Sequence, residues 1–131
     1  MDYSFADVNL NDAQDLKTVP AGEYKLVIAG DPQVNEAKYY FRIPMEIEGQ
    51  DSFTKRLNHF LFFPKPDDDP EKKNNKLLRL REFCQAFKIE QAQLRNPDSL
   101  VGLRAEAILK EEDEGEFGVQ NKVGRFVVPR G

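Results

Sequence analysis

The chain has 131 residues, with 23 acidic and 19 basic side chains and a formal net charge of -4. This length is typical of one globular domain with a single core. No apolar run approaches the ~20 residues that cross a bilayer, and the acidic start MDYSFADVNLNDAQD lacks the basic and apolar parts of a signal peptide. The composition therefore argues against a membrane protein, and we expect a protein of a reducing cytoplasm.

The charge also limits the class of partner. A pI near 5.1 argues against a protein that coats duplex DNA by charge alone. Binding of single-stranded nucleic acid is compatible with this pI, because much of its energy comes from bases that stack on aromatic side chains. Such a protein needs only a locally positive groove for the phosphates. Ten Phe and four Tyr residues supply such rings, although most aromatic residues of a small domain belong to its core.

The first part of the chain predicts an arm followed by two strands. Residues 1–18 match neither a helix nor a strand, and we expect them to lie as an arm over a domain of residues 19–129. Residues 23–29 alternate in polarity after a turn, which is typical of a strand. Residues 38–47 alternate again, and a proline at position 44 predicts a bend or a sheet edge there. The residues expected to face inward are Tyr39, Phe41, Ile43, Met45 and Ile47.

A third strand is predicted over residues 51–63, but its apolar end leaves two registers open. We favour the register that turns Phe53, Leu57, Leu61 and Phe63 inward. The alternative register, shifted by one residue, buries Phe60 and Phe62 and exposes His59. Because side chains alternate between the two faces of a strand, these registers give opposite surfaces.

A helix and two more strands complete the predicted fold. Asp69 followed by Pro70 predicts a helix start after a polar loop. A further helical turn is predicted at 90–95. It precedes a strand at 101–109, which is expected to bury Val101. An acidic hairpin at 111–118 then leads to a last strand at 119–128. The apolar residues at helical spacing, which we expect to be buried, are Leu77, Leu80, Phe83, Cys84 and Phe87.

This order of elements predicts the fold class. Three strands, one helix and two strands indicate a mostly β fold, and specifically a five-stranded barrel of the oligonucleotide-binding type with the helix between strands three and four. A sheet with one packed helix and a small sandwich are the alternatives.

Enzymatic interpretations find little support in the sequence. His59 and Cys84 are the single histidine and cysteine, so a four-ligand zinc site is excluded, and a thiol on an apolar helix face is expected to be unreactive. Asp67, Asp68 and Asp69 are consecutive and point in different directions, which favours a solvated loop and a helix cap over a magnesium site. We therefore expect no catalytic residues, no metal and no cofactor.

The outward faces of the second and third strands carry a more specific pattern. Basic groups and rings alternate there on one surface, as single-stranded DNA requires: cations for the phosphates and flat rings for the bases. Structural roles compete with this interpretation, because Phe60 and Phe62 could belong to the core or lie under the arm. The predicted nucleic-acid-binding residues are Lys38, Tyr40, Arg42, Arg56, Asn58, Phe60 and Phe62, extended on the last strand by Lys122 and Arg125.

Five segments carry a resemblance to a known family. VPAGEYKLVIAG, RLNHFLFF, KLLRLREFCQAFKI and LVGLRAEAILKEED with a closing GRFVVP resemble a family of small phage and prophage proteins, long catalogued as of unknown function and often encoded among replication and recombination genes. The likeness spans about residues 19–129. It implies single-stranded DNA binding on an oligonucleotide-binding fold. Many single-strand binders carry an acidic C-terminal tail, whereas this sequence ends in VVPRG.

The leading prediction is a non-enzymatic single-stranded DNA-binding protein of a bacteriophage, acting in DNA replication or recombination in the cytoplasm of an infected or lysogenic bacterium. Its partners would be single-stranded DNA and proteins of replication or recombination. The alternative, favoured by the net acidity, is a protein-binding adaptor or virion module of the same fold. A metal-dependent nuclease is a third class, which rests on the aspartate run alone.

Overall fold

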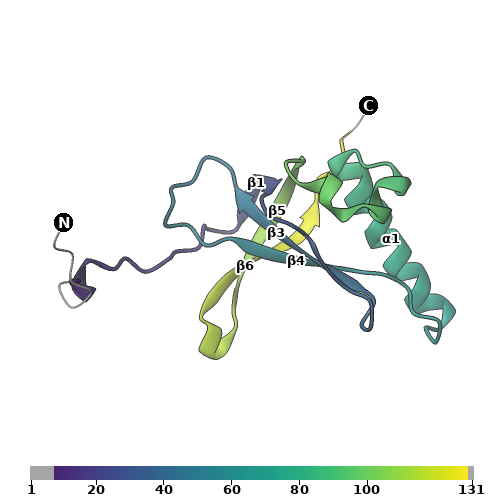
Figure 1. The fold of residues 1–131 in the computed structure, drawn as a ribbon, viewed down its shortest axis with the longest axis horizontal. Coiled ribbons are helices and arrows are strands. Elements are labelled where there is room, and N and C mark those ends of the chain that lie inside the picture. The colour runs from purple at the N-terminus through teal and green to yellow at the C-terminus, as the bar shows by residue number, and fades with distance from the viewer. Residues whose placement is uncertain (1–7, 130–131) are drawn as a thin grey trace, which may run out of the picture.

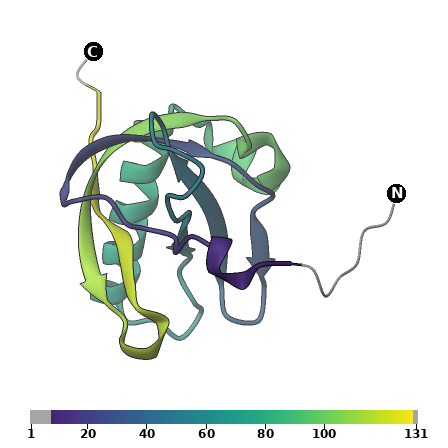
Figure 2. The same ribbon diagram turned by 90° about the vertical axis from the view of Figure 1, so that its left-hand side faces the viewer.

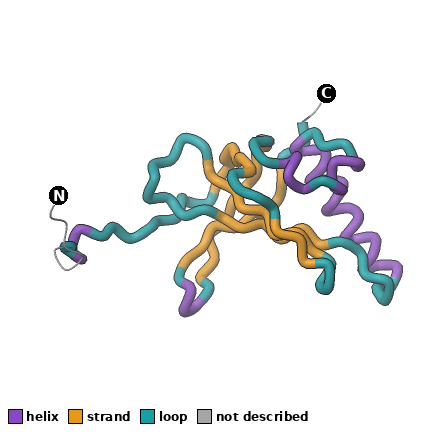
Figure 3. Tube along the Cα trace, in the orientation of Figure 1, coloured by secondary structure: helices purple, strands orange, loops and turns teal. Residues whose placement is uncertain are grey.

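The computed structural model describes residues 8–129, and within this range the chain forms six antiparallel strands and one long helix. The fold is mostly β, as predicted. Strands occupy the centre, and most helical residues gather at one end (Figure 3). The elements are β1 (Gly22–Ile28), β2 (Gln33–Asn35), β3 (Tyr40–Ile47), β4 (Leu57–Phe62), α1 (Pro70–Phe87), β5 (Arg104–Asp113) and β6 (Val119–Phe126), with short helical turns at Leu10–Asp12, Gln91–Arg95, Pro97–Leu100 and Gly115–Phe117.

The sheet is curved but is not closed as a barrel (Figures 1 and 2). β1 pairs with β3 and β5, β5 pairs with β6, and β3 pairs with β4 along its other edge. β4 and β6 lie near each other, yet no backbone ladder joins them within residues 8–129. The predicted barrel closure is therefore not observed. The helix follows the third predicted strand, which is β4 in the structure because the unpredicted β2 precedes it.

The extra strand β2 forms a short hairpin with the start of β3. Gln33 pairs with Arg42 and Asn35 pairs with Tyr40. The turn between these strands requires a left-handed conformation at Tyr39, which has a φ of 58°. Tyr39 is consequently exposed and precedes β3, so its expected inward position is wrong. The other four residues that we expected to face inward from this strand are buried.

The core lies between the inner faces of the strands and the second half of α1. Phe41 and Ile43 of β3 and Leu57 and Leu61 of β4 are buried. Phe83 of α1 is completely buried, and each large apolar side chain of this kind contributes about 1.5 to 3 kcal/mol. The burial of Leu57 and Leu61 thus confirms the favoured register of β4 at these two positions.

The helix begins where the sequence predicts. The Asp69 side chain accepts a hydrogen bond of 2.7 Å from the Lys72 N–H, and Pro70 is the first helical residue. Burial along the helix starts only at Leu80, so Leu77 is 45% exposed and the expectation that it is buried is wrong. Cys84 is half-buried, less than expected, and this burial raises the pKa of its thiol.

Two strands begin later than predicted because polar turns occupy their expected starts. Asp51 accepts a 2.9 Å hydrogen bond from the Phe53 N–H, which turns the chain before β4 and leaves Phe53 41% exposed rather than inward. Pro97–Leu100 forms a helical turn before β5, so Leu100 is buried in place of Val101, which is exposed. The predicted helical turn at 90–95 is present as Gln91–Arg95.

The described part of the N-terminal arm extends away from the sheet, opposite α1 (Figure 1), instead of lying over the domain. Lys17 joins it to the body through a bridge to Thr54. Burial begins at Val19, whose backbone N–H and C=O each bond the buried Asn121 side chain at 2.9 Å. The first seven residues of the predicted arm lie outside the described range.

Candidate nucleic-acid interface

Three aromatic rings stand together on the outer surface of β3 and β4. The alternation that buries Phe41 and Leu61 turns Tyr40, Phe60 and Phe62 to the opposite side. We call these three residues the aromatic face. Phe60 is 44% exposed and Phe62 is 48% exposed, so the described part of the arm does not cover them and they are not core residues.

The strand register fixes the geometry of the aromatic face. Tyr40 pairs directly with Phe62, and Arg42 pairs with Phe60. The Tyr40 ring packs in a T-shaped arrangement against both phenylalanines, with its centroid 5.4 Å from that of Phe60 and 5.7 Å from that of Phe62. Phe60 and Phe62 are nearly parallel, 23° apart in plane with centroids at 6.4 Å. Side chains two positions apart on one strand therefore offer parallel, accessible ring surfaces.

A hydrogen bond holds one side of the aromatic face in place. The Asn35 amide of β2 donates to the Tyr40 hydroxyl at 3.3 Å, and its oxygen accepts from the Lys38 N–H at 3.0 Å. The unpredicted strand β2 thus supports the ring that contacts the other two. Lys38 itself lies in the turn before β3 rather than on the strand, so its predicted placement on the strand face is wrong.

The predicted cations differ in their availability. Arg42 is exposed beside Phe60, and no ion pair to it is found among residues 8–129. Arg56 bonds Glu46 at 2.7 Å. Asn58 is exposed on β4 and pairs with Pro44, one step along from Arg42 on the same surface. Arg42 is therefore the available cation next to the rings.

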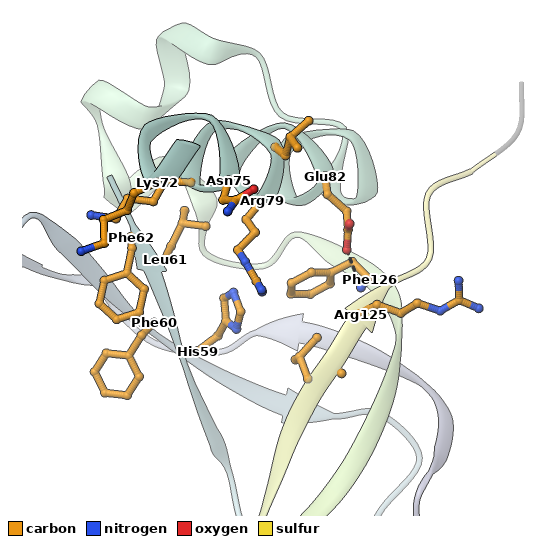
Figure 4. Close-up of a pocket in the computed structure, with 14 residues that line it drawn as sticks. His59, Phe60, Leu61, Phe62, Lys72, Asn75, Arg79, Glu82, Arg125 and Phe126 are labelled. Carbon is orange, nitrogen blue, oxygen red and sulfur yellow. Dashed lines mark hydrogen bonds between the residues drawn. The ribbon is translucent and has the colours of Figure 1, made fainter. Parts of the chain in front are cut away.

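The two predicted residues of β6 lie in different surroundings. Lys122 pairs with Glu112 at 3.3 Å and with Glu114, and these carboxylates raise the pKa of Lys122. It is thus neutralised within the acidic hairpin. Arg125 lies nearer the end of β6 and lines a cleft that also includes Phe60 and Phe62. The structure therefore brings Arg125, but not Lys122, to this cleft, and the Arg125 side chain points away from the aromatic face (Figure 4).

This cleft has a volume of about 720 Å³ and lies where β4 and β6 fail to pair (Figure 4). Helix α1 spans the gap, and its Glu82 carboxylate accepts a 3.0 Å hydrogen bond from the Phe126 N–H at the end of β6. A side chain of the helix therefore satisfies a backbone donor that a neighbouring strand would satisfy in a closed sheet. The charged residues lining the cleft are Lys72, Lys76, Arg79, Glu82 and Arg125.

His59 forms the floor of the cleft and is uncharged at neutral pH. Its ring stacks on Phe83, 4° from parallel with centroids 6.0 Å apart, and meets Phe126 edge-on at 5.1 Å. Burial, together with the nearby charge of Arg79, lowers the pKa of His59 from 6.5 to about 4. Cys84 lines a separate groove on the other flank of α1, so the two residues are not brought together as a base and a nucleophile.

The three consecutive aspartates have separate structural surroundings. Asp69 caps α1, whereas Asp68 accepts hydrogen bonds from the Lys65 N–H at 2.8 Å and from the Lys76 ammonium at 2.7 Å. These bonds lower the pKa of Asp68. Asp67 is exposed. Within residues 8–129, no group of three or more His, Cys, Asp or Glu side chains is placed to hold a metal ion.

Sequence reasoning missed the contribution of the helix to this surface. Lys72, Lys76 and Arg79 follow one another at spacings of four and three residues, which places them on one side of a helix. That spacing was visible in the sequence. Its meaning was not, because only the fold shows that this side of α1 faces β4 and β6 across an open gap.

Among residues 8–129, no helix combines the length and apolar character needed to cross a membrane. No family model matches the sequence, and neither does any curated protein.

Proposed function

We propose that this protein binds single-stranded DNA, without catalysing a reaction, and serves replication or recombination of a bacteriophage. The observation that carries the proposal is the aromatic face: the exposed rings of Phe60 and Phe62 pack with the half-buried ring of Tyr40 on the adjacent strand, and Arg42 lies beside them. Exposed rings leave apolar surface in water, so a cluster of them indicates a surface that becomes covered on binding. Phage origin and the cellular process rest on the sequence resemblance.

Single-stranded nucleic acid is the ligand whose chemistry fits these residues. Each base has a flat π surface, and stacking on an aromatic side chain contributes about 1 to 3 kcal/mol per base. Phe60 and Phe62 present nearly parallel rings, and Arg42 is placed to contact a phosphate. Bases in a duplex are already stacked and paired, so the rings would have nothing to gain from double-stranded DNA.

The distribution of charge reconciles this proposal with a net charge of -4. Five of the 23 acidic side chains lie in the β5–β6 hairpin, where Glu112 and Glu114 are bound to Lys110 and Lys122. The hairpin projects away from α1 (Figure 1), whereas Lys72, Arg79 and Arg125 line the cleft beside α1. A local positive surface therefore exists on an acidic molecule, which is the arrangement that a single-strand binder needs.

The strand order gives a second, independent line of support. Apart from the short β2, the order β1, β3, β4, α1, β5, β6 is that of the oligonucleotide-binding fold. The third and fifth strands of that order, β4 and β6, do not pair here. In that fold the second and third strands carry the ligand-binding surface. In the proposed assignment β3 and β4 correspond to these strands, and they carry the aromatic face.

The test is a titration of fluorescein-labelled oligothymidine followed by anisotropy. We expect the wild-type protein to bind without sequence preference and without cleaving the DNA. The double variant Tyr40→Ala with Phe60→Ala should weaken binding by about 2 to 5 kcal/mol, because two stacking contacts are lost. Phe117→Ala is the matched control, because Phe117 is 73% exposed but lies at the tip of the acidic hairpin. Its affinity should equal that of the wild type.

The same titration separates the proposal from its alternative. If the wild-type protein does not bind oligothymidine, or if Phe117→Ala and the double variant behave alike, the aromatic face is not a stacking surface for DNA. A protein-binding adaptor or virion module would then be the better interpretation of the fold.

A further inference from the structure

We infer that the bound single strand passes from the aromatic face over the edge of β4 into the cleft between α1, β4 and β6, where Lys72, Arg79 and Arg125 hold its phosphates. This inference rests on the proposed function and adds the path of the DNA. It assigns a binding role to Lys72 and Arg79 of α1, which are not among the nucleic-acid-binding residues predicted from the sequence.

The first support is that the two surfaces are continuous. Phe60 and Phe62 belong to the aromatic face and also line the cleft. In Figure 4 their rings lie on one side of β4, while His59 and Arg79 lie on the other side of the same strand. A chain that stacks its bases on the phenylalanines therefore needs to cross only one strand to reach the helix. The free edge of β4 leaves that crossing open.

The second support is the charge of the cleft. Lys72, Arg79 and Arg125 form no ion pair with any of the residues 8–129. Lys76 is bound to Asp68, and the carboxylate of Glu82 is engaged by the Phe126 N–H. Three cations thus remain available against one carboxylate. Such a concave surface attracts a phosphate chain.

The shape and floor of the cleft suit a sugar–phosphate backbone. Its volume is about 720 Å³, and the uncharged aromatic rings of His59 and Phe126 form the bottom. Arg79 of α1 reaches toward His59, whereas the Arg125 side chain of β6 points out of the cleft (Figure 4). The Asn75 amide adds a neutral hydrogen-bond donor on the helix side. Arg79 is therefore placed to contact a phosphate inside the cleft, and Arg125 would contact one after its flexible side chain turns inward from the rim.

The third support is that the opposite exit from the aromatic face is unfavourable for DNA. Beyond Arg42 on β3, the surface continues to Glu46, whose carboxylate binds Arg56 at 2.7 Å. Farther on, Glu48 binds Arg104. The cations on that side already have carboxylate partners, and a phosphate chain would have to displace those carboxylates. The helix side offers unpaired cations instead.

The experiment compares two double variants on a labelled 15-mer of thymidine over a range of salt concentrations. Lys72→Gln with Arg79→Gln removes two cations from the cleft. Lys25→Gln with Arg95→Gln removes the same charge from exposed positions on β1 and on the Gln91–Arg95 turn. We expect the cleft variant to bind about tenfold more weakly and to reduce the salt slope by about 1.4, which corresponds to two phosphates. The control pair should change both quantities little.

The aromatic variant Tyr40→Ala with Phe60→Ala distinguishes the two proposals in the same assay. It should weaken binding without changing the salt slope, because stacking releases no counterions. If the aromatic variant weakens binding in this way while the cleft variant behaves like the control variant, the path through the cleft is wrong and the proposed function stands. If the aromatic variant binds normally and the cleft variant does not, the aromatic face is wrong. If the wild-type protein does not bind the 15-mer, both fail. Urea midpoints verify that all variants are folded.

Discussion

Neighbouring residues of β3 and β4 have opposite roles because successive side chains point to opposite faces. Phe41 is buried against the core, where its ring lies 4.6 Å from that of Phe63, whereas Phe60 faces solvent. We expect Phe41→Ala to lower the free energy of unfolding by about 3 to 5 kcal/mol, because it opens a cavity. Phe60→Ala should change it little, and urea denaturation measures both. An equal loss in the two variants would contradict the assigned faces.

His59 makes the stability of the fold depend on pH. Burial keeps the ring neutral and lowers its pKa from 6.5 to about 4, so in this interval the unfolded chain takes up a proton that the folded one does not. The contribution is fully present above pH 6.5 and is lost as the pH falls toward 4. The loss amounts to about 2 to 3 kcal/mol.

The matched variant for this prediction is His59→Phe, which keeps a ring between Phe83 and Phe126 but cannot be charged. Unfolding by urea at several pH values between 4 and 6.5 should show a shallower loss of stability in the variant than in the wild type. Parallel curves would mean that His59 is not held neutral by its surroundings.

Single residues could be predicted from the sequence where alternation was regular, and not where an element ended. Phe60 and Phe62 alternate with buried residues along β4, so their outward direction followed from the pattern. Tyr39 and Phe53 continue the same patterns in the sequence but lie in turns, because turn hydrogen bonds and a positive φ end the strand periodicity there. Apolar character alone does not show where a strand begins.

At the scale of elements, the start of α1 gives a direct test. Asp69 accepts the Lys72 N–H, which would otherwise lack a partner in the first turn. We expect Asp69→Ala to destabilise the fold by about 1 kcal/mol. Asp67→Ala is the matched control, because Asp67 is exposed two residues before the cap. A comparison of their urea midpoints checks this, and equal midpoints would contradict the role of the cap.

The elements that could be predicted were those with strong local signals. The Asp69–Pro70 pair specified the helix start, and long alternation specified β1 and β3. β2 was missed because Gln33–Asn35 is too short to show a period of two, and it exists only by pairing with β3. Its absence from the prediction also hid the support that Asn35 gives to Tyr40.

At the scale of the whole molecule, the open edge between β4 and β6 could not be predicted. Whether two strands distant in sequence pair depends on contacts that no local pattern encodes. Here Glu82 of α1 takes the Phe126 N–H, and the helix occupies the space beside β4. The opening leaves a cationic side of α1 along a cleft that Phe60 and Phe62 also line. The candidate site is therefore partly a product of tertiary structure, even though the alternation of side chains along the strands predicted the outward direction of its rings.

The central claim is that a single strand binds on the outer surface of β3 and β4. The most direct measurement is amide chemical-shift mapping by NMR during addition of unlabelled oligothymidine to the ¹⁵N-labelled protein. We predict that the largest shifts belong to the amides around Tyr40, Arg42, Phe60 and Phe62, with those around Arg79 following, while the hairpin around Phe117 is unchanged. Shifts confined to other surfaces, or no shifts at concentrations where the DNA is in excess, would contradict the account.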